Sequence, residues 1–278
     1  MAVPGIVFCD MDGTLLATDK SVPELNLRAL DLLAERGIPF VPCTGRPVSA
    51  VPGPVAAHPA ARYAIGANGG VVVDMRAEAT LKVTGIDKDR VLELYERVRT
   101  WPMTFDVFAD GVVYSERARY DSMGSLGIHP ATLATLRQVR TPVDLMVPQI
   151  VARARNVEKL TCFFGDLGLR ARLKAEAESI GGLDCACGDP NDLEIMAPGV
   201  SKGSALVWLC EHLGIPVASA VAFGDEDNDA SMLRSAGTGV AMANATLAVK
   251  AVSDTLAPSN DDAGVGRHLL QMLLAGTA

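Results

Sequence analysis

The sequence predicts an α/β fold with a doubly wound, Rossmann-like parallel sheet as its core and an inserted α/β module. Short apolar runs alternate with segments of helical periodicity, as in parallel sheets that are covered on both faces. Polar clusters directly follow several of these runs, where the ligands of such sheets bind. The pattern of apolar runs followed by polar clusters occurs in the first and last parts of the chain but not in the middle part. This indicates a core that is split by an insertion.

Composition and charge limit the class of protein. The 278 residues, 49% hydrophobic and 21% charged, are typical of a globular chain of one large or two moderate domains. The net charge is −8 without a block of Lys and Arg, so we expect no nucleic-acid partner. No apolar run approaches the roughly 20 residues of a membrane span, and the N-terminus lacks the features of a signal peptide. We expect a cytoplasmic monomer or homodimer without a membrane partner.

Strands and helices alternate in the first part of the chain. Residues 5–9 are apolar and predict a buried strand, and residues 25–36 carry apolar side chains at helical spacing before Gly37, a suitable C-terminal stop. Further along we expect a strand at 38–43, a helix interrupted by prolines within 48–57, a strand at 63–65, and a hairpin of 71–73 with 81–83.

The middle and last parts predict the remaining elements. The middle part combines helices at 91–99, 130–138 and 169–179 with strands at 111–114 and 160–164. The last part combines helices at 205–213 and 230–234 with strands at 217–223 and 239–242. We therefore expect the core in residues 1–84 and 194–278, with the insertion in 85–193. Residues 276–278 are expected to be frayed.

The run Asp10-Met11-Asp12-Gly13-Thr14 follows the first strand. Residues two apart in extended geometry point the same way, so both carboxylates can face one ligand while Met11 points away and leaves its main-chain groups nearby. Gly13 permits a sharp turn, and Thr14 can donate a hydrogen bond to a carboxylate. Taken alone, the run also fits an acidic turn without catalytic chemistry.

A second acidic cluster follows the strand expected at 217–223. Asp225, Asn228 and Asp229 come directly after Gly224. Two strand-end carboxylate clusters in one parallel sheet suit a hard cation such as Mg²⁺. The alternative is a solvated loop in which Asp229 caps the helix at 230–234, and we expect Asp229 to serve both purposes.

Two further segments could hold a phosphate group. Thr44 and Gly45 follow the second strand with a hydroxyl and main-chain N–H groups, and Arg46 comes next. Lys202 precedes a helix and could neutralise a phosphate oxygen, although most lysines are ordinary surface residues. The chain has no P-loop motif, and its isolated His residues offer no triad.

In their order along the chain, these four clusters resemble the haloacid dehalogenase-like superfamily of phosphatases. The family pattern is Asp-x-Asp-Gly-Thr, then Ser or Thr, then Lys, then Gly-Asp-x-x-Asn-Asp, and it extends over essentially the whole chain. The segments Thr44-Gly45-Arg46-Pro47, Asn68-Gly69-Gly70 and Gly199-Val200-Ser201-Lys202-Gly203 narrow the resemblance to the Cof-type branch, subclass IIB. In that branch the insertion is an α/β cap.

The resemblance implies a role for each cluster. Asp10 would be the nucleophile, and Asp12 the general acid and then the general base. Mg²⁺ would be held by Asp10, the Asp12 main-chain carbonyl and Asp225, with Asp229 supporting the metal or Lys202. The phosphate group would be bound by Met11, Thr44, Gly45, Lys202 and Asn228.

The resemblance also implies a small phosphorylated metabolite, such as a sugar phosphate or a phosphorylated cofactor, as the substrate. A phosphosugar mutase and a non-catalytic phosphometabolite-binding protein are the alternatives, because both can share the scaffold. The cap would select the substrate. Its polar candidates are Arg117, Arg119, Lys159 and Asn191, although each of them also fits an ordinary surface residue.

Overall fold

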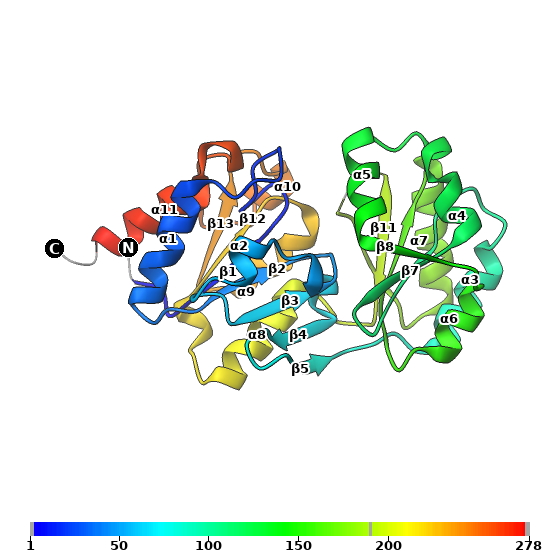
Figure 1. Ribbon diagram of the computed structural model, residues 1–278, viewed down its shortest axis with the longest axis horizontal. Coiled ribbons are helices and arrows are strands. Elements are labelled where there is room, and N and C mark those ends of the chain that lie inside the picture. The colour runs from blue at the N-terminus through cyan, green and yellow to red at the C-terminus, as the bar shows by residue number, and fades with distance from the viewer. Residues whose placement is uncertain (1–2, 189–190, 276–278) are drawn as a thin grey trace. The chain divides into compact units, whose positions relative to one another are not determined.

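A computed structural model describes residues 3–188 and 191–275 (Figure 1). The expectation for residues 276–278 lies outside the described residues. The chain divides into two compact units, one formed by Met1–Lys82 with Ser201–Ala278 and the other by Val83–Val200. The first unit is therefore a core that the second unit interrupts once along the chain.

An eight-stranded sheet forms the centre of the first unit, in the order β14-β13-β12-β1-β2-β3-β4-β5. Its strands are β1 Ile6–Asp10, β2 Phe40–Cys43, β3 Tyr63–Gly66, β4 Val71–Asp74, β5 Ala79–Val83, β12 Ala220–Gly224, β13 Thr238–Met242 and β14 Thr255–Ala257. All pairs from β14 to β3 are parallel, and β3 pairs antiparallel with β4. The predicted parallel core is confirmed.

Both faces of this sheet are covered. Every residue of β1 is buried, as expected for a strand between two layers of helices. The helices of this unit are α1 Glu24–Glu35, α2 Gly53–Ala56, α8 Lys202–Leu213, α9 Ala230–Ser235, α10 Leu247–Lys250 and α11 Gly264–Ala275. α1 packs against α11, and α8 packs against α9 (Figure 1).

One strand begins later than its apolar run predicts. The strand expected at 217–223 is β12, which begins at Ala220, because Val217–Ser219 form a 3₁₀ turn directly after Pro216. The fixed φ of proline favours such a turn. The interruption expected within 48–57 is present: Val51 is extended before Pro52 and separates the 3₁₀ turn Val48–Ala50 from α2.

The second unit contains a six-stranded sheet in the order β10-β11-β9-β6-β7-β8. Its elements are α3 Lys88–Val98, β6 Asp106–Ala109, β7 Val112–Glu116, α4 Arg117–Ser122, α5 Pro130–Val139, β8 Arg140–Val143, α6 Val147–Arg153, β9 Val157–Phe163, α7 Gly168–Ile180, β10 Asp184–Ala186 and β11 Asp192–Met196. A separate apolar core includes Val91, Leu160 and Leu173. Within 3–188 and 191–275, no helix is long and apolar enough to span a bilayer.

The second unit extends slightly beyond 85–193 at both ends. β11 pairs with β9 and β10, so residues up to Met196 belong to its sheet. Val200 is the last residue of this unit, and Ser201 begins the return to the first. The chain thus crosses between the units after Lys82 and after Val200.

We expect Glu158 in β9 to make the stability of the second unit depend on pH. It is 3% exposed, and its burial raises the pKa of its carboxyl to about 7 although main-chain N–H groups oppose the shift. A raised pKa in the folded state means that the stabilisation is complete below the unfolded pKa near 4.5 and is lost as the pH rises through about 7. Glu158→Gln should therefore stabilise the protein by up to about 3 kcal/mol at pH 8 and much less at pH 5.

Urea unfolding of both proteins at the two pH values measures this difference. An equal change at pH 5 and pH 8 would contradict the assignment of the effect to ionisation of Glu158.

Candidate active site

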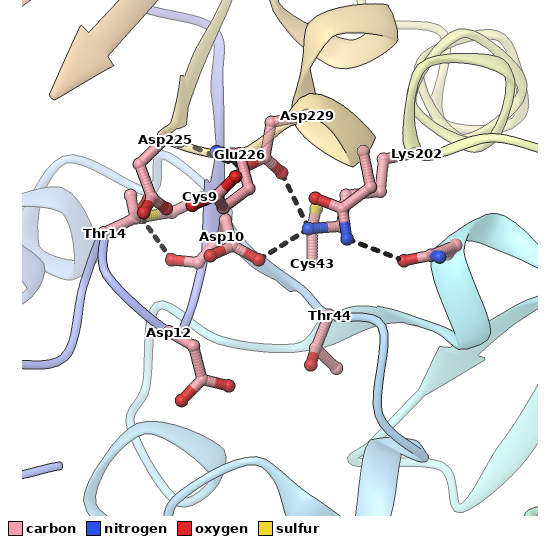
Figure 2. A network of polar contacts seen from close by, with 12 residues as sticks. Cys9, Asp10, Asp12, Thr14, Cys43, Thr44, Lys202, Asp225, Glu226 and Asp229 are labelled. Atoms are coloured by element: carbon pink, nitrogen blue, oxygen red, sulfur yellow. Dashed lines mark hydrogen bonds and ion pairs between the residues drawn. The ribbon is translucent and has the colours of Figure 1, made fainter. Parts of the chain in front are cut away.

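Three neighbouring strands of the core sheet end in polar residues. Asp10 is the last residue of β1, Thr44 follows β2, and Asp225 follows β12. Because β1 lies between β12 and β2, these residues meet at the carboxyl edge of the sheet. Figure 2 shows Asp10, Thr44 and Asp225 grouped with Lys202 and Asp229. The convergence that the strand-end pattern predicts is present.

Lys202 is the centre of a buried ionic network. It is the first residue of α8 and follows the N-cap Ser201. Its Nζ lies 2.5 Å from Asp10 Oδ1 and 2.6 Å from Asp229 Oδ1, and the side chain is 1% exposed. A buried ammonium is tolerated only with such partners. Lys202 therefore restrains both carboxylates, and it is not an ordinary surface lysine.

Asp229 is engaged through both carboxylate oxygens. Oδ1 accepts the contact from Lys202, and Oδ2 accepts hydrogen bonds from the main-chain N–H groups of Asp225, at 3.0 Å, and Glu226, at 3.2 Å. Asp229 occupies the N-cap position of α9, but its side chain makes no capping hydrogen bond. The predicted capping role of its side chain is wrong, because the carboxylate turns back to its own loop and to Lys202.

Thr14 and Gly13 determine how Asp225 is oriented. The Thr14 hydroxyl donates to Asp225 Oδ1 at 2.7 Å, and both side chains are buried. Gly13 has φ +79°, and a Cβ added there would lie 2.2 Å from Asp225 Oδ2. Glycine is thus required at residue 13 both for the backbone conformation and for the close approach of this carboxylate.

Gly13→Ala should displace Asp225 and weaken the binding of a divalent cation at the candidate site formed by Asp10, Asp225 and Asp229. We expect the Mg²⁺ concentration for half-maximal binding or activation to rise by about tenfold or more, the usual effect of disturbing a ligand's support. Gly37→Ala is the matched control, since Gly37 has φ +66° and nothing within 4 Å of the added Cβ. It should share the backbone cost of about 1–2 kcal/mol but keep the Mg²⁺ response. Equal Mg²⁺ titrations for both variants would contradict this account.

Three carboxylates can converge on one cation. One oxygen from each of Asp10, Asp225 and Asp229 lies within 4.8 Å of the others, and all three residues are buried. Hard carboxylate oxygens are the donors that Mg²⁺ prefers. The donor set therefore fits a divalent cation of this type.

The charges of this group explain its pKa shifts. Burial and the neighbouring Asp229 raise the pKa of Asp10 well above its usual range, and they raise the pKa of Asp225 to about 7. Burial lowers the pKa of Lys202, but Asp10 and Asp229 outweigh this effect and raise it well above its usual value. Lys202 therefore stays cationic. When they are ionised, the three carboxylates of Asp10, Asp225 and Asp229 carry more negative charge than the one ammonium of Lys202 neutralises. Such an environment favours a bound cation.

Asp12 lies apart from the ionic network around Lys202 (Figure 2). Its side chain is 33% exposed. Its Oδ1 accepts contacts from Lys20 Nζ at 2.9 Å and from Arg46 Nη2 at 2.6 Å. The two aspartates of the first motif thus have different surroundings: Asp10 is buried among charges, and Asp12 is accessible.

The residues predicted to bind phosphate lie on the loops around this edge. Met11 buries its side chain in the apolar core. Thr44 is buried, and its Oγ1 accepts from the Arg46 N–H at 3.1 Å. Gly45 is half-buried between them. Asn228 is half-buried, and its Nδ2 donates to Asn68 Oδ1 at 3.4 Å.

Asn68 and Arg46 belong to the sequence motifs but have no predicted role, and Lys20 is not among the predicted site residues. Asn68 is buried with φ +55° in the 3₁₀ turn Ala67–Gly69 that follows β3, and its position near a strand end was the available signal. No local pattern identifies Lys20.

The four polar residues proposed for the cap all have a partner within the second unit. Arg117 pairs with Asp144, Arg119 with Glu116 and Lys159 with Glu194, and Asn191 donates to the main-chain oxygen of Phe164.

Known proteins share the sequence pattern along most of this chain. The family model described as haloacid dehalogenase-like hydrolase matches residues 7–269. The chain is 29% identical over 274 residues to pyridoxal phosphate phosphatase YbhA of Escherichia coli (strain K12), covering 97% of this chain and 98% of the relative. It is 30% identical over 244 residues to HMP-PP phosphatase of Klebsiella pneumoniae (strain 342), covering 87% of this chain and 85% of the relative.

A solved structure shares the fold. It is a haloacid dehalogenase-like hydrolase from B. subtilis, with a TM-score of 0.82 and 26% identity, and the match covers 96% of this chain and 99% of that chain. Both units of the chain are therefore present in that structure.

Proposed function

Because the chain belongs to the haloacid dehalogenase-like hydrolase family, we propose that it is a magnesium-dependent phosphatase acting through an aspartyl-phosphate on Asp10. The observation that carries the proposal is the contact of Lys202 with Asp10 and Asp229 at the carboxyl edge of the sheet. This contact holds the carboxylate of Asp10, as the nucleophile, next to the ammonium of Lys202, and a phosphate group needs both. The relatives named as phosphatases of pyridoxal phosphate and HMP-PP support phosphate monoesters of small metabolites as the substrates.

In the first half-reaction, a carboxylate oxygen of Asp10 attacks phosphorus and the bond from phosphorus to the ester oxygen breaks. Asp12 gives its proton to the departing oxygen, so the product leaves as an alcohol. Lys202 restrains Asp10 through Oδ1 at 2.5 Å, which limits the rotation that would spoil an in-line attack. Thr44 and main-chain N–H groups nearby are suited to the phosphate oxygens.

In the second half-reaction, Asp12 takes a proton from water while the water oxygen attacks phosphorus. The bond between phosphorus and Asp10 then breaks, which regenerates the Asp10 carboxylate and releases inorganic phosphate. Asp12 suits this role because its side chain is accessible, whereas that of Asp10 is only 9% exposed. The substrate and one water are thus converted to an alcohol and phosphate.

Asp10, Asp225 and the main-chain carbonyl of Asp12 would hold the Mg²⁺. When bound, the cation neutralises the repulsion between the carboxylates and the phosphate oxygens. We assign Asp229 to positioning rather than to direct ligation, because both of its oxygens already accept hydrogen bonds. Thr14 orients Asp225 by its hydrogen bond to Oδ1.

We assign substrate selection to the inserted unit, which would act as the cap. Its independent apolar core and its attachment at two crossings support this division of labour. The first unit would then carry out the phosphoryl transfer, and the second unit would select the leaving group of the substrate.

A panel of phosphorylated metabolites, assayed for free phosphate with Mg²⁺ present, tests the proposal. We expect turnover of at least one phosphate monoester, loss of activity in excess chelator, and recovery on adding Mg²⁺. A phosphosugar mutase would release little free phosphate and would need a bisphosphorylated activator. Full activity in excess chelator, or binding of metabolites without turnover, would contradict the proposal.

A further inference from the structure

Two cations from separate loops contact the same oxygen of Asp12. Lys20 Nζ lies 2.9 Å from Asp12 Oδ1, and Arg46 Nη2 lies 2.6 Å from that atom. Within residues 3–188 and 191–275, Oδ2 of Asp12 accepts no hydrogen bond. One oxygen of this carboxylate is therefore held, and the other is open.

The main-chain segments that carry the two cations are held by hydrogen bonds. The Arg46 N–H donates to Thr44 Oγ1, and its main-chain oxygen accepts from the Ala67 N–H at 3.0 Å. Lys20 has φ +70°, and its N–H donates to the Ala17 oxygen at 2.9 Å in a tight turn. Each cation thus belongs to a loop with its own main-chain hydrogen bonds.

Fold stability is a poor explanation for these contacts. The Lys20 side chain is 48% exposed and that of Arg46 is 26% exposed. Ion pairs of such exposure contribute about 0–1 kcal/mol. They can, however, fix the rotamer of Asp12, and the placement of a catalytic group matters far more to rate than to stability.

The geometry also determines which oxygen can carry a proton. A proton on Oδ1 would face the N–H donors of Lys20 and Arg46, which already use that oxygen as their acceptor. Oδ2 is therefore the oxygen that is left to exchange a proton with a reacting group. Transfer to a leaving group then requires that Oδ2, and not Oδ1, points to the reacting phosphate.

We propose that Lys20 and Arg46 are positioning residues that hold Asp12 by Oδ1, so that Oδ2 gives the proton to the leaving group and later accepts one from water. This inference rests on the proposed function, specifically on the proton transfer by Asp12. In the first step, the bond from phosphorus to the ester oxygen breaks, Asp10 bonds to phosphorus, and the Oδ2 proton moves to the ester oxygen.

Two substrates of similar size separate positioning of the acid from binding of the substrate. The p-nitrophenolate of p-nitrophenyl phosphate leaves readily without a proton, whereas the alkoxide of benzyl phosphate needs one. We take the ratio of kcat/KM for p-nitrophenyl phosphate to kcat/KM for benzyl phosphate. This ratio reports the first half-reaction alone, because hydrolysis of the aspartyl-phosphate follows the release of the alcohol. A misplaced acid raises this ratio, and a misfolded or weakly binding enzyme does not.

We expect Arg46→Met and Lys20→Met each to lower kcat/KM for benzyl phosphate about tenfold or more, with less than about threefold loss for p-nitrophenyl phosphate. The loss should be a fraction of the roughly 10²–10⁴-fold that complete removal of a general acid costs, which Asp12→Asn measures. Arg46→Lys should have a ratio between those of wild type and Arg46→Met, because lysine keeps a positive charge at this residue. Arg28→Met, which removes an exposed charge on α1, should leave both values unchanged.

Equal losses on both substrates in Arg46→Met and Lys20→Met would overturn the inference and indicate contacts with the substrate instead. An unchanged ratio in Asp12→Asn would overturn it as well, by removing Asp12 as the proton donor. Release of phosphate that still depends on Asp10 would leave the proposed phosphatase function standing in either case.

Discussion

Asp10→Asn is expected to lower phosphate release from p-nitrophenyl phosphate by about 10⁴-fold or more, as removal of a nucleophile commonly does. The amide oxygen is a poor nucleophile, and no carboxylate remains at the end of β1 to form the aspartyl-phosphate. The fold should survive, because asparagine has nearly the same shape and Lys202 keeps Asp229 as a partner at 2.6 Å. Single-turnover assays with Mg²⁺ and thermal unfolding measure the two effects.

Asp31→Asn is the matched control for Asp10→Asn. Asp31 is on α1 with a side chain that is 67% exposed, and its contact is with His58 at 3.1 Å. The same chemical change should leave turnover within about twofold of wild type at such a surface site. Turnover near the wild-type rate in Asp10→Asn itself would remove Asp10 as the nucleophile.

Lys202→Met should destabilise the protein by about 3–5 kcal/mol at pH 8, the usual cost of leaving a buried charge without its partner. Asp10 and Asp229 would both lose their ammonium in an almost fully buried setting. Turnover should fall at least about 100-fold, because the nucleophile loses its restraint and the site loses a positive charge. Urea unfolding and phosphate release measure the two losses.

The stability loss of Lys202→Met should shrink at pH 5. Burial raises the pKa of Asp10 well above its usual range even beside the ammonium, so without Lys202 the stability is present at low pH and is lost as the pH rises. Adding Asp229→Asn should recover much of the stability but none of the activity. A loss below about 1 kcal/mol at pH 8 would contradict a buried network in which Lys202 compensates Asp10 and Asp229.

The core and the position of the site could be predicted because their signals are local. Apolar runs such as 5–9 identify buried strands by themselves, and polar residues directly after them identify the ligand edge. Asp10, Thr44 and Asp225 meet because β12, β1 and β2 are neighbours in a parallel sheet. The topology of such sheets is restricted enough to make this meeting expected.

The contacts of individual side chains could not be predicted in the same way. Asp229 has the sequence position of an N-cap, yet Lys202 and the N–H groups of its own loop compete successfully for its oxygens. The contacts of Asp12 with Lys20 and Arg46 depend on the course of two loops, for which no periodic pattern exists. The late start of β12 reflects the preference of Pro216 for a turn over continuation of an apolar run.

The two crossings make the inserted unit exchangeable. The residue at which the chain re-enters, Ser201, is fixed on the core side: an added Cβ at Gly69 would lie 2.2 Å from its main-chain oxygen, and one at Gly203 would lie 2.4 Å from that of Ser231. A chimaera joined after Lys82 and before Ser201 would leave these contacts and Lys202 intact. On the proposed division of labour between the two units, a different insertion would bring a different substrate range while the residues around Lys202 stay unchanged.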